Sequence, residues 1–168
     1  MLLEGSCHCQ AVKFALQSEH PYPFNLCYCS ICRKTAGGGG YAINLSGDSA
    51  TLHVSGEAHV RTYRARVAAG NRSEPRESGS ERNFCGLCGS ALWVYAPPWP
   101  GLVHPFASAV DTPLPVPPAR THLMLASKAS WVPVHVEPAD KQFDAYPDES
   151  IAQWHARHGL VVGKRHER

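Results

Sequence analysis

The sequence has few charged residues, no large excess of either sign and no long apolar run. Charged side chains make up 18% of the 168 residues, and the formal net charge is only +2. Nucleic-acid-binding domains usually carry a strong basic field, so we expect no nucleic-acid partner. Proline, glycine or histidine interrupts each apolar stretch well before it could span a bilayer, so we expect no membrane partner.

Long helices are also not expected, because the chain contains 14 glycines and 14 prolines. These residues place turns throughout the sequence, which should therefore consist mainly of strands and loops. A chain of this length is sufficient for one domain with a real core and is short for two. Residues 1–5 are too few to form a signal peptide, and we expect a cytoplasmic protein whose thiols stay reduced.

Cysteine, by contrast, is abundant and clustered. The seven cysteines form three tight groups: Cys7 and Cys9; Cys27, Cys29 and Cys32; Cys85 and Cys88. Disulfides are a poor explanation, since the count is odd and Cys-x-Cys neighbours are badly placed to pair. A redox dithiol would use a Cys-x-x-Cys pair but would leave the Cys-x-Cys groups without a purpose. The pattern favours thiolate ligands for a soft cation such as zinc.

Seven thiolates divide naturally into four plus three. Four satisfy tetrahedral zinc, whereas three leave a position where a water or a substrate thiol could bind. Spacing alone does not say which pair joins Cys85 and Cys88. Only the trio Cys27, Cys29 and Cys32 can supply three ligands from one turn, so we assign it to the open site and the other four cysteines to a closed one.

Hydrophobic patterning predicts short elements along the chain. We expect strands at 10–17, 41–45, 50–55, 59–65, 91–96, 102–108 and 121–126, and a short helical turn after Cys29. The three strands between 41 and 65 suggest an antiparallel meander, and the polar stretch 67–82 suggests a mobile loop. Asp148 is the expected N-cap of one amphipathic helix that ends at Gly159.

Candidate ligand-binding residues lie close to the trio. Arg33 and Lys34 could offset the charge of substrate carboxylates. The run of glycines at 37–40, Gly38 and Gly39 within it, would let a ligand approach the backbone closely. Trp131 is the aromatic side chain that we expect to border a ligand.

Several motifs in one order resemble those of the glutathione-dependent formaldehyde-activating enzyme family, whose domain also occurs in centromere protein V. The matching segments are GSCHCQAVKF at 5–14, CYCSICRK at 27–34, FCGLCGS at 84–90, ASKASW at 126–131 and DKQF at 140–143. The sequence departs from the family pattern at Tyr28, where many members carry histidine, and at Ser130, where proline is usual.

The resemblance implies an Mss4-like fold, in which several coiled antiparallel sheets are stapled by zinc. Residues 1–147 would form the zinc-binding domain, and 148–168 a short C-terminal helix and basic tail. By the same resemblance Cys7, Cys9, Cys85 and Cys88 bind a structural zinc, and Cys27, Cys29 and Cys32 a catalytic one. The implied activity is that of a carbon–sulfur lyase that joins glutathione, as co-substrate, to formaldehyde or a related small aldehyde.

Two alternatives to this enzyme remain to be compared with it. A zinc-stapled binding module without chemistry would fill the fourth position of the second metal, with His8, His20, His104 or His122 as candidates. A sulfoxide reductase would need a free cysteine, and none remains after the four-plus-three division. The sequence does not fix the oligomeric state, and a homodimer is one alternative.

Overall fold

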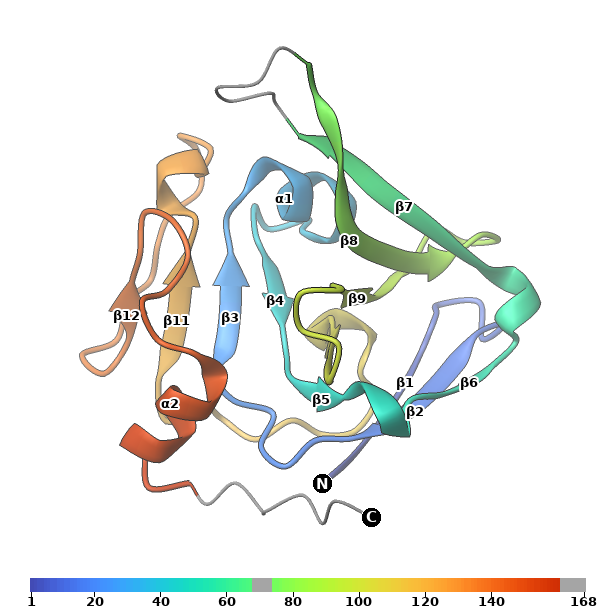
Figure 1. Cartoon of the computed structure of the whole chain (residues 1–168), viewed down its shortest axis with the longest axis horizontal. Helices are drawn as coiled ribbons and strands as arrows, with labels where there is room; N and C mark the ends of the chain where they lie inside the picture. The colour runs from blue at the N-terminus through green and yellow to red at the C-terminus, as the bar shows by residue number, and fades with distance from the viewer. Residues whose placement is uncertain (68–73, 161–168) are drawn as a thin grey trace.

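The computed structural model describes residues 1–67 and 74–160 of the chain. Within those residues the strands form three sheets and there are two short α-helices, so the fold is mainly β with a short C-terminal helix, as expected (Figure 1). The helices are α1 (Ser30–Ala36) and α2 (Ile151–Arg157), and single 3₁₀ turns occur at Ser49–Thr51, Glu57–His59, Ala107–Ala109 and Leu125–Ser127. In the described part of the chain no helix is both long and apolar enough to cross a membrane.

The first sheet is antiparallel and consists of β1 (Leu2–Ser6), β2 (Lys13–Gln17) and β6 (His53–Ser55). Alternate residues of β1 and β2 are buried, which is the period-two pattern of a sheet with one face on the core. The turn between these two strands carries Cys7 and Cys9. Pairing of Ser6 with Lys13 fixes the ends of that turn.

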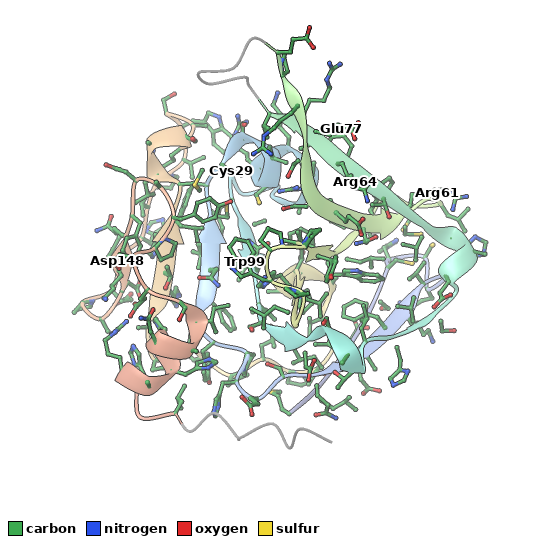
Figure 2. All side chains as sticks on the ribbon, viewed as in Figure 1. Cys29, Arg61, Arg64, Glu77, Trp99 and Asp148 are labelled. Atoms are coloured by element: carbon green, nitrogen blue, oxygen red, sulfur yellow. The ribbon has the colours of Figure 1, made fainter. Side chains whose placement is uncertain are left out.

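The second sheet has the order β5 (Gly47–Asp48), β10 (Leu102–Pro105), β9 (Ala91–Tyr95), β8 (Arg76–Cys85), β7 (Val60–Val67), and all its pairs are antiparallel. The stretch 67–82 was predicted to be a mobile loop, and this prediction is wrong for residues 76–82, which belong to β8. Residues 68–73 lie outside the described part. Residues 76–82 of β8 lack apolar side chains because this part of the strand pairs with β7 in a largely exposed ribbon, on which Figure 2 labels Arg64 and Glu77. Arg64 also forms an ion pair with Glu81.

The third sheet has the order β12 (Lys141–Gln142), β11 (Arg120–Leu123), β3 (Phe24–Cys27), β4 (Ala42–Asn44). Its β3–β4 pair is antiparallel, but β11 runs parallel to both β3 and β12. The sheets are therefore not all antiparallel. Figure 1 shows this sheet beside α1 and α2.

The predicted meander between residues 41 and 65 is not formed. β4 pairs with β3, β6 with β2 and β7 with β8, so consecutive strands enter three different sheets. The predicted strand at 50–55 begins as a 3₁₀ turn, and those at 102–108 and 121–126 end in one. The structure of these segments is decided by the distant strands with which they pair, and the local hydrophobic pattern does not show which strands those are.

Strand β9 lies between two buried clusters. Its Trp93 belongs to a cluster with Cys7 and Cys85, whereas its Val94 belongs to a cluster with Cys27 and Cys32. Because successive side chains of a strand point to opposite faces, β9 separates the surroundings of the two cysteine sites.

Helix α2 packs against the same body of strands. Its Trp154 is buried beside the ring of Tyr22, and Nε2 of His155 lies 2.7 Å from the carbonyl oxygen of Tyr22. The predicted N-cap was Asp148, and this is wrong by two residues. Ser150 caps the helix, and Gly159 follows its end with a positive φ of 67°.

Candidate metal centres and thiol site

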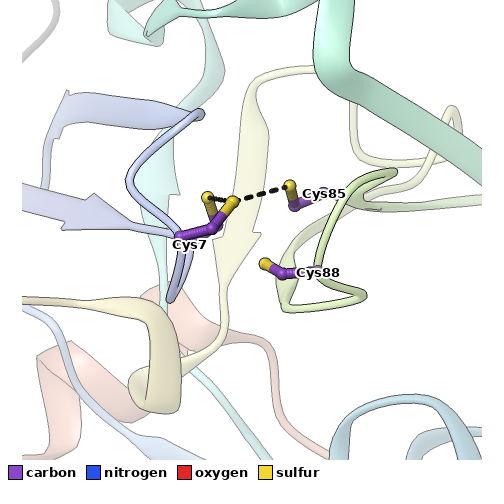
Figure 3. Close-up of side chains that lie close together, drawn as sticks. Cys7, Cys85 and Cys88 are labelled. Atoms are coloured by element: carbon purple, nitrogen blue, oxygen red, sulfur yellow. Dashed lines mark hydrogen bonds between the residues drawn. The ribbon is translucent and has the colours of Figure 1, made fainter.

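Four cysteine sulfurs meet where the β1–β2 turn faces the end of β8. Cys7, Cys9, Cys85 and Cys88 have Sγ atoms that all lie within 4.8 Å of one another (Figure 3). The Sγ of Cys9 is 3.5 Å from that of Cys7 and 3.8 Å from that of Cys85. Tetrahedral zinc with bonds of about 2.3 Å to sulfur separates its ligands by about 3.8 Å, so these two separations are close to those of a tetrahedral zinc site.

Tight turns aim these sulfurs at one point. After Cys85 the chain reverses so that the amide of Gly89 donates to the carbonyl of Cys85, and Gly89 has a φ of +76°, which favours glycine. The amide of Val12 donates to the sulfur of Cys7, 3.2 Å away. The hydroxyl of Ser90, 3.2 Å from the sulfur of Cys88, helps to lower the pKa of that thiol to about 5. The last two contacts favour the thiolate forms of Cys7 and Cys88.

The other three cysteines meet at the end of β3. Cys27 is the last residue of β3, Cys29 caps the N-terminus of α1 and Cys32 lies in its first turn. Their sulfurs lie within 4.8 Å of one another, and no histidine or carboxylate of residues 1–67 and 74–160 joins them. Cys27 and Cys32 are buried and Cys29 is half-buried. The described residues thus offer three ligands and leave a fourth position to a non-protein group.

Protons are shared unequally among the three thiols. Hydrogen bonds from Cys27 and Cys32 lower the pKa of Cys29 to about 2, and the amide of Cys32 also donates to its sulfur. The hydrogen bond with Cys29, then that with Cys32 and burial, raise the pKa of Cys27 strongly. Three thiolates so close together repel one another, and a divalent cation removes that repulsion. The trio therefore suits a metal better than it suits three free thiols.

The histidines considered as a fourth ligand form other contacts or lie elsewhere. Nδ1 of His104 is 2.9 Å from the carbonyl oxygen of Leu45. Both ring nitrogens of His122 face polar groups of Tyr28 and Asp140. His20 packs edge-on against the ring of His155, and the amide of His8 donates to Ser90 beside the four-sulfur site.

The predicted ligand-binding residues are only partly gathered around the trio. Arg33 and Lys34 lie on α1 directly after Cys32; Lys34 is exposed, and Nε of Arg33 is buried without a hydrogen-bond partner. Gly38 and Gly39 are exposed in the turn after α1, with open space where a side chain would stand. Trp131 is 62% exposed.

Two residues near the trio were not predicted from the sequence. Arg82 on β8 has two guanidinium nitrogens buried without a hydrogen-bond partner, and its charge acts on Cys32. Tyr146 is 68% exposed, and partial desolvation, followed by the charges of the three cysteines of the trio, raises its pKa. Arg82 was missed because its segment was interpreted as a loop. Nothing in the local sequence distinguishes Tyr146 from other surface tyrosines.

A pocket of about 460 Å³ with mixed polar and apolar walls lies beside the four-sulfur site and not at the trio. Its walls are formed by Ser6, Cys7, His8, Gln10, Thr35, Ala36, Ser90, Ala91, Ser108, Ala109 and Asp111. The hydroxyl of Ser6 donates to Asp111, and the described wall residues carry no buried cation that lacks a partner. None of the three cysteines of the trio lines this pocket.

Comparisons with known proteins find one matching family model and similar proteins from two organisms. The family model described as "Glutathione-dependent formaldehyde-activating enzyme" matches residues 2–125. A Halomonas elongata protein named "Putative glutathione-dependent formaldehyde-activating enzyme" is 61% identical over 163 residues, which is 97% of this chain and 100% of that protein. A crystal structure of a Rhodobacter sphaeroides protein is similar with a TM-score of 0.51 and 23% identity, covering 67% of this chain and 91% of that one. The last likeness concerns the fold alone.

Proposed function

The chain belongs to the glutathione-dependent formaldehyde-activating enzyme family, and we propose that it is a zinc-dependent carbon–sulfur lyase acting on the glutathione adduct of formaldehyde or a related small aldehyde. In the adding direction the glutathione sulfur forms a bond to the carbonyl carbon. The carbonyl π electrons move to oxygen, which takes up the proton that the thiol released. In the lyase direction the carbon–sulfur bond breaks and the same electrons and proton return.

The observation that carries this proposal is the three-sulfur site itself. Three converging cysteine sulfurs, which no fourth ligand from the described residues joins, form the donor set of a metal that accepts an exogenous ligand. Zinc held there by Cys27, Cys29 and Cys32 would lower the pKa of a bound thiol and present it as thiolate at neutral pH. The second zinc, held by Cys7, Cys9, Cys85 and Cys88, would have all four positions filled and serve the fold.

The remaining assignments in the proposal concern the substrate and the setting. Arg33, Lys34, the amides of Gly38 and Gly39, and Trp131 are the proposed contacts of glutathione. Residues 1–147 form the proposed zinc-binding domain, with 148–168 packed on it or trailing from it. A cytoplasmic location would supply both the reducing conditions that free thiolates need and the glutathione.

Metal content and thiol binding together test the proposal. We expect two zinc ions per wild-type chain and one in Cys29→Ser, in which calorimetry should detect no glutathione binding. A matched control is Cys88→Ser, which alters the closed site and should reduce thermal stability more than Cys29→Ser does. Glutathione-dependent turnover that persists in Cys29→Ser would overturn the proposal.

The binding module without chemistry predicts a different result from the same measurements. A filled fourth position would prevent wild-type protein from binding glutathione at all, whatever its zinc content. Cobalt substitution sharpens the distinction, because a thiol that enters the coordination sphere adds a sulfur-to-cobalt absorption band. Absence of any spectral change at saturating glutathione would favour the module.

A further inference from the structure

Strand pairing places Arg82 on the face of β8 that looks toward the trio. Arg82 lies directly opposite Val94 of β9, and Val94 packs in the buried cluster that contains Cys27 and Cys32. Side chains directly opposite each other on antiparallel strands share a face of the sheet. The neighbouring pair, Asn83 with Trp93, faces the other cluster. Arg82 is thus directed to the three-sulfur site by register.

The guanidinium of Arg82 has no partner among the described residues to explain its burial. Its Nε and Nη1 are both buried and form no hydrogen bond. The surface arginines behave differently: Arg64 is paired with Glu81, and Arg157 with Glu149. A buried cation without an acceptor is costly unless negative charge lies nearby. Cys32, on which the charge of Arg82 acts, is a nearby group of the trio that can carry such charge.

Electrostatics is consistent with this placement. The positive charge of Arg82 acts both on Cys32 and on Tyr146. Ala145, next to that tyrosine, accepts a hydrogen bond from Met124, and Met124 packs against the trio's cluster. The guanidinium and the phenol therefore border the same site.

The three-sulfur site with a bound metal ion would carry a net negative charge. Three thiolates and one divalent metal ion carry a net charge of −1, and a substrate thiolate in the fourth position makes it −2. Collecting that charge in a half-buried site is unfavourable without compensation. We propose that Arg82 is a positioning residue whose partly buried positive charge offsets the thiolate-rich centre and thereby favours binding of the substrate sulfur as thiolate.

This inference rests on the proposed function but makes a separate prediction about ligand charge. Because the effect is on sulfur, it should be equal for glutathione and for 2-mercaptoethanol, which has no carboxylate. Neutralising one charge at about 6 Å in a protein environment changes binding by tenfold or more. A neutral ligand at the same metal position, such as imidazole, should be affected little.

The test uses the cobalt-substituted full-length protein and its variants Arg82→Gln and Arg82→Lys. We expect Arg82→Gln to weaken both thiols by about tenfold or more while imidazole affinity stays within about twofold, and Arg82→Lys to restore most of the loss. Arg64→Gln, on the neighbouring strand β7, removes an exposed arginine and should bind as wild type does. If Arg82→Gln loses its metal or does not fold, Arg82→Met is tested in its place, because methionine also removes the charge and keeps an apolar side chain of similar length.

The possible results distinguish a failure of the proposed function from a failure of the role proposed for Arg82. If the wild type binds neither thiol, the proposed function fails. If the wild type binds thiols and Arg82→Gln binds them equally well, only the role of Arg82 is refuted. A loss confined to glutathione would mean that Arg82 pairs with a carboxylate, and an equal loss for imidazole would mean that it only shapes the site; either result overturns the inference.

Discussion

The hydroxyl of Tyr28 lies 3.0 Å from Nδ1 of His122, in a buried layer directly behind the three-sulfur site. Tyr28 stands between Cys27 and Cys29, but its side chain packs with Leu26 and Val132 in a different cluster from theirs. On the other side of His122, Nε2 is 3.3 Å from Oδ2 of Asp140. This buried chain links the residue after β3 to β11 and thereby holds the segment that carries Cys27, at the end of β3, and Cys29, at the start of α1.

Replacing Tyr28 by phenylalanine removes one hydrogen bond without removing the ring. Since His122 is fully buried, its Nδ1 would be left without a partner, and we expect a loss of about 1–3 kcal/mol in the free energy of unfolding. Zinc content should stay unchanged, because no ligand is altered. Denaturant unfolding measures the loss, and Tyr63→Phe on exposed β7 is the matched control. A Tyr28→Phe protein as stable as the control would show that the contact contributes nothing net.

We expect acid to weaken the buried contacts among Tyr28, His122 and Asp140. Burial raises the pKa of Asp140, but the amides of Glu137 and Arg120 and the ring of His122 outweigh it and lower the pKa overall. A carboxylate with a lowered folded-state pKa contributes stability above the unfolded value of about 3.9, and the contribution is lost as pH falls through the folded-state pKa. We expect the stability difference between wild type and Asp140→Asn to be largest near neutral pH and to shrink below about pH 4.

Acid also protonates the cysteine ligands and thereby weakens the fold of every variant. The effect of Asp140 is therefore the difference in the free energy of unfolding between wild type and Asp140→Asn at one pH, measured with equal zinc content in the two proteins. A difference between wild type and Asp140→Asn that is constant from neutral pH to pH values below about 3 would contradict the assignment of the charge to Asp140.

The sequence reveals the cysteine sites better than it reveals the sheets around them. Ligand spacing is local, so the grouping of Cys27 with Cys29 and Cys32 follows from a few neighbouring residues, and the structure brings their sulfurs together. The joining of Cys7 and Cys9 with Cys85 and Cys88 spans the chain and was chosen by counting ligands. The structure brings these sulfurs together as well.

Strand partners and buried charges could not be predicted in this way. A strand's pattern shows which face is buried but not which strand lies beside it, and β4, β6 and β7 each pair outside the predicted meander. Arg82 stands in a charged segment whose exposed end looks like a loop. Only the register of β8 against β9 shows that its side chain faces the trio.

Helix α2 offers a direct test of a corrected prediction. Ser150 accepts from the amide of Gln153, and the Gln153 side chain accepts from the amide of Ser150 at 2.7 Å, so both residues form a capping box. We expect Ser150→Ala to cost about 1 kcal/mol in stability and Asp148→Ala less than about 0.5 kcal/mol. Chemical denaturation of both variants measures the difference. Equal losses would restore Asp148 as a cap.

The glycine run after α1 contains one position that the fold itself requires. Gly40 has a φ of +97°, and a Cβ built there would lie 2.2 Å from Cγ2 of Val132, whereas Gly38 has open space around it. Gly40→Ala should therefore destabilise the protein by about 1–3 kcal/mol, and Gly38→Ala should be nearly neutral or slightly stabilising. Thermal unfolding checks both. If Gly38 is a contact of glutathione, its alanine variant should bind the thiol more weakly at unchanged stability, since the new methyl group blocks approach to the backbone. An equally stable Gly40→Ala would show that Val132 moves aside at little cost.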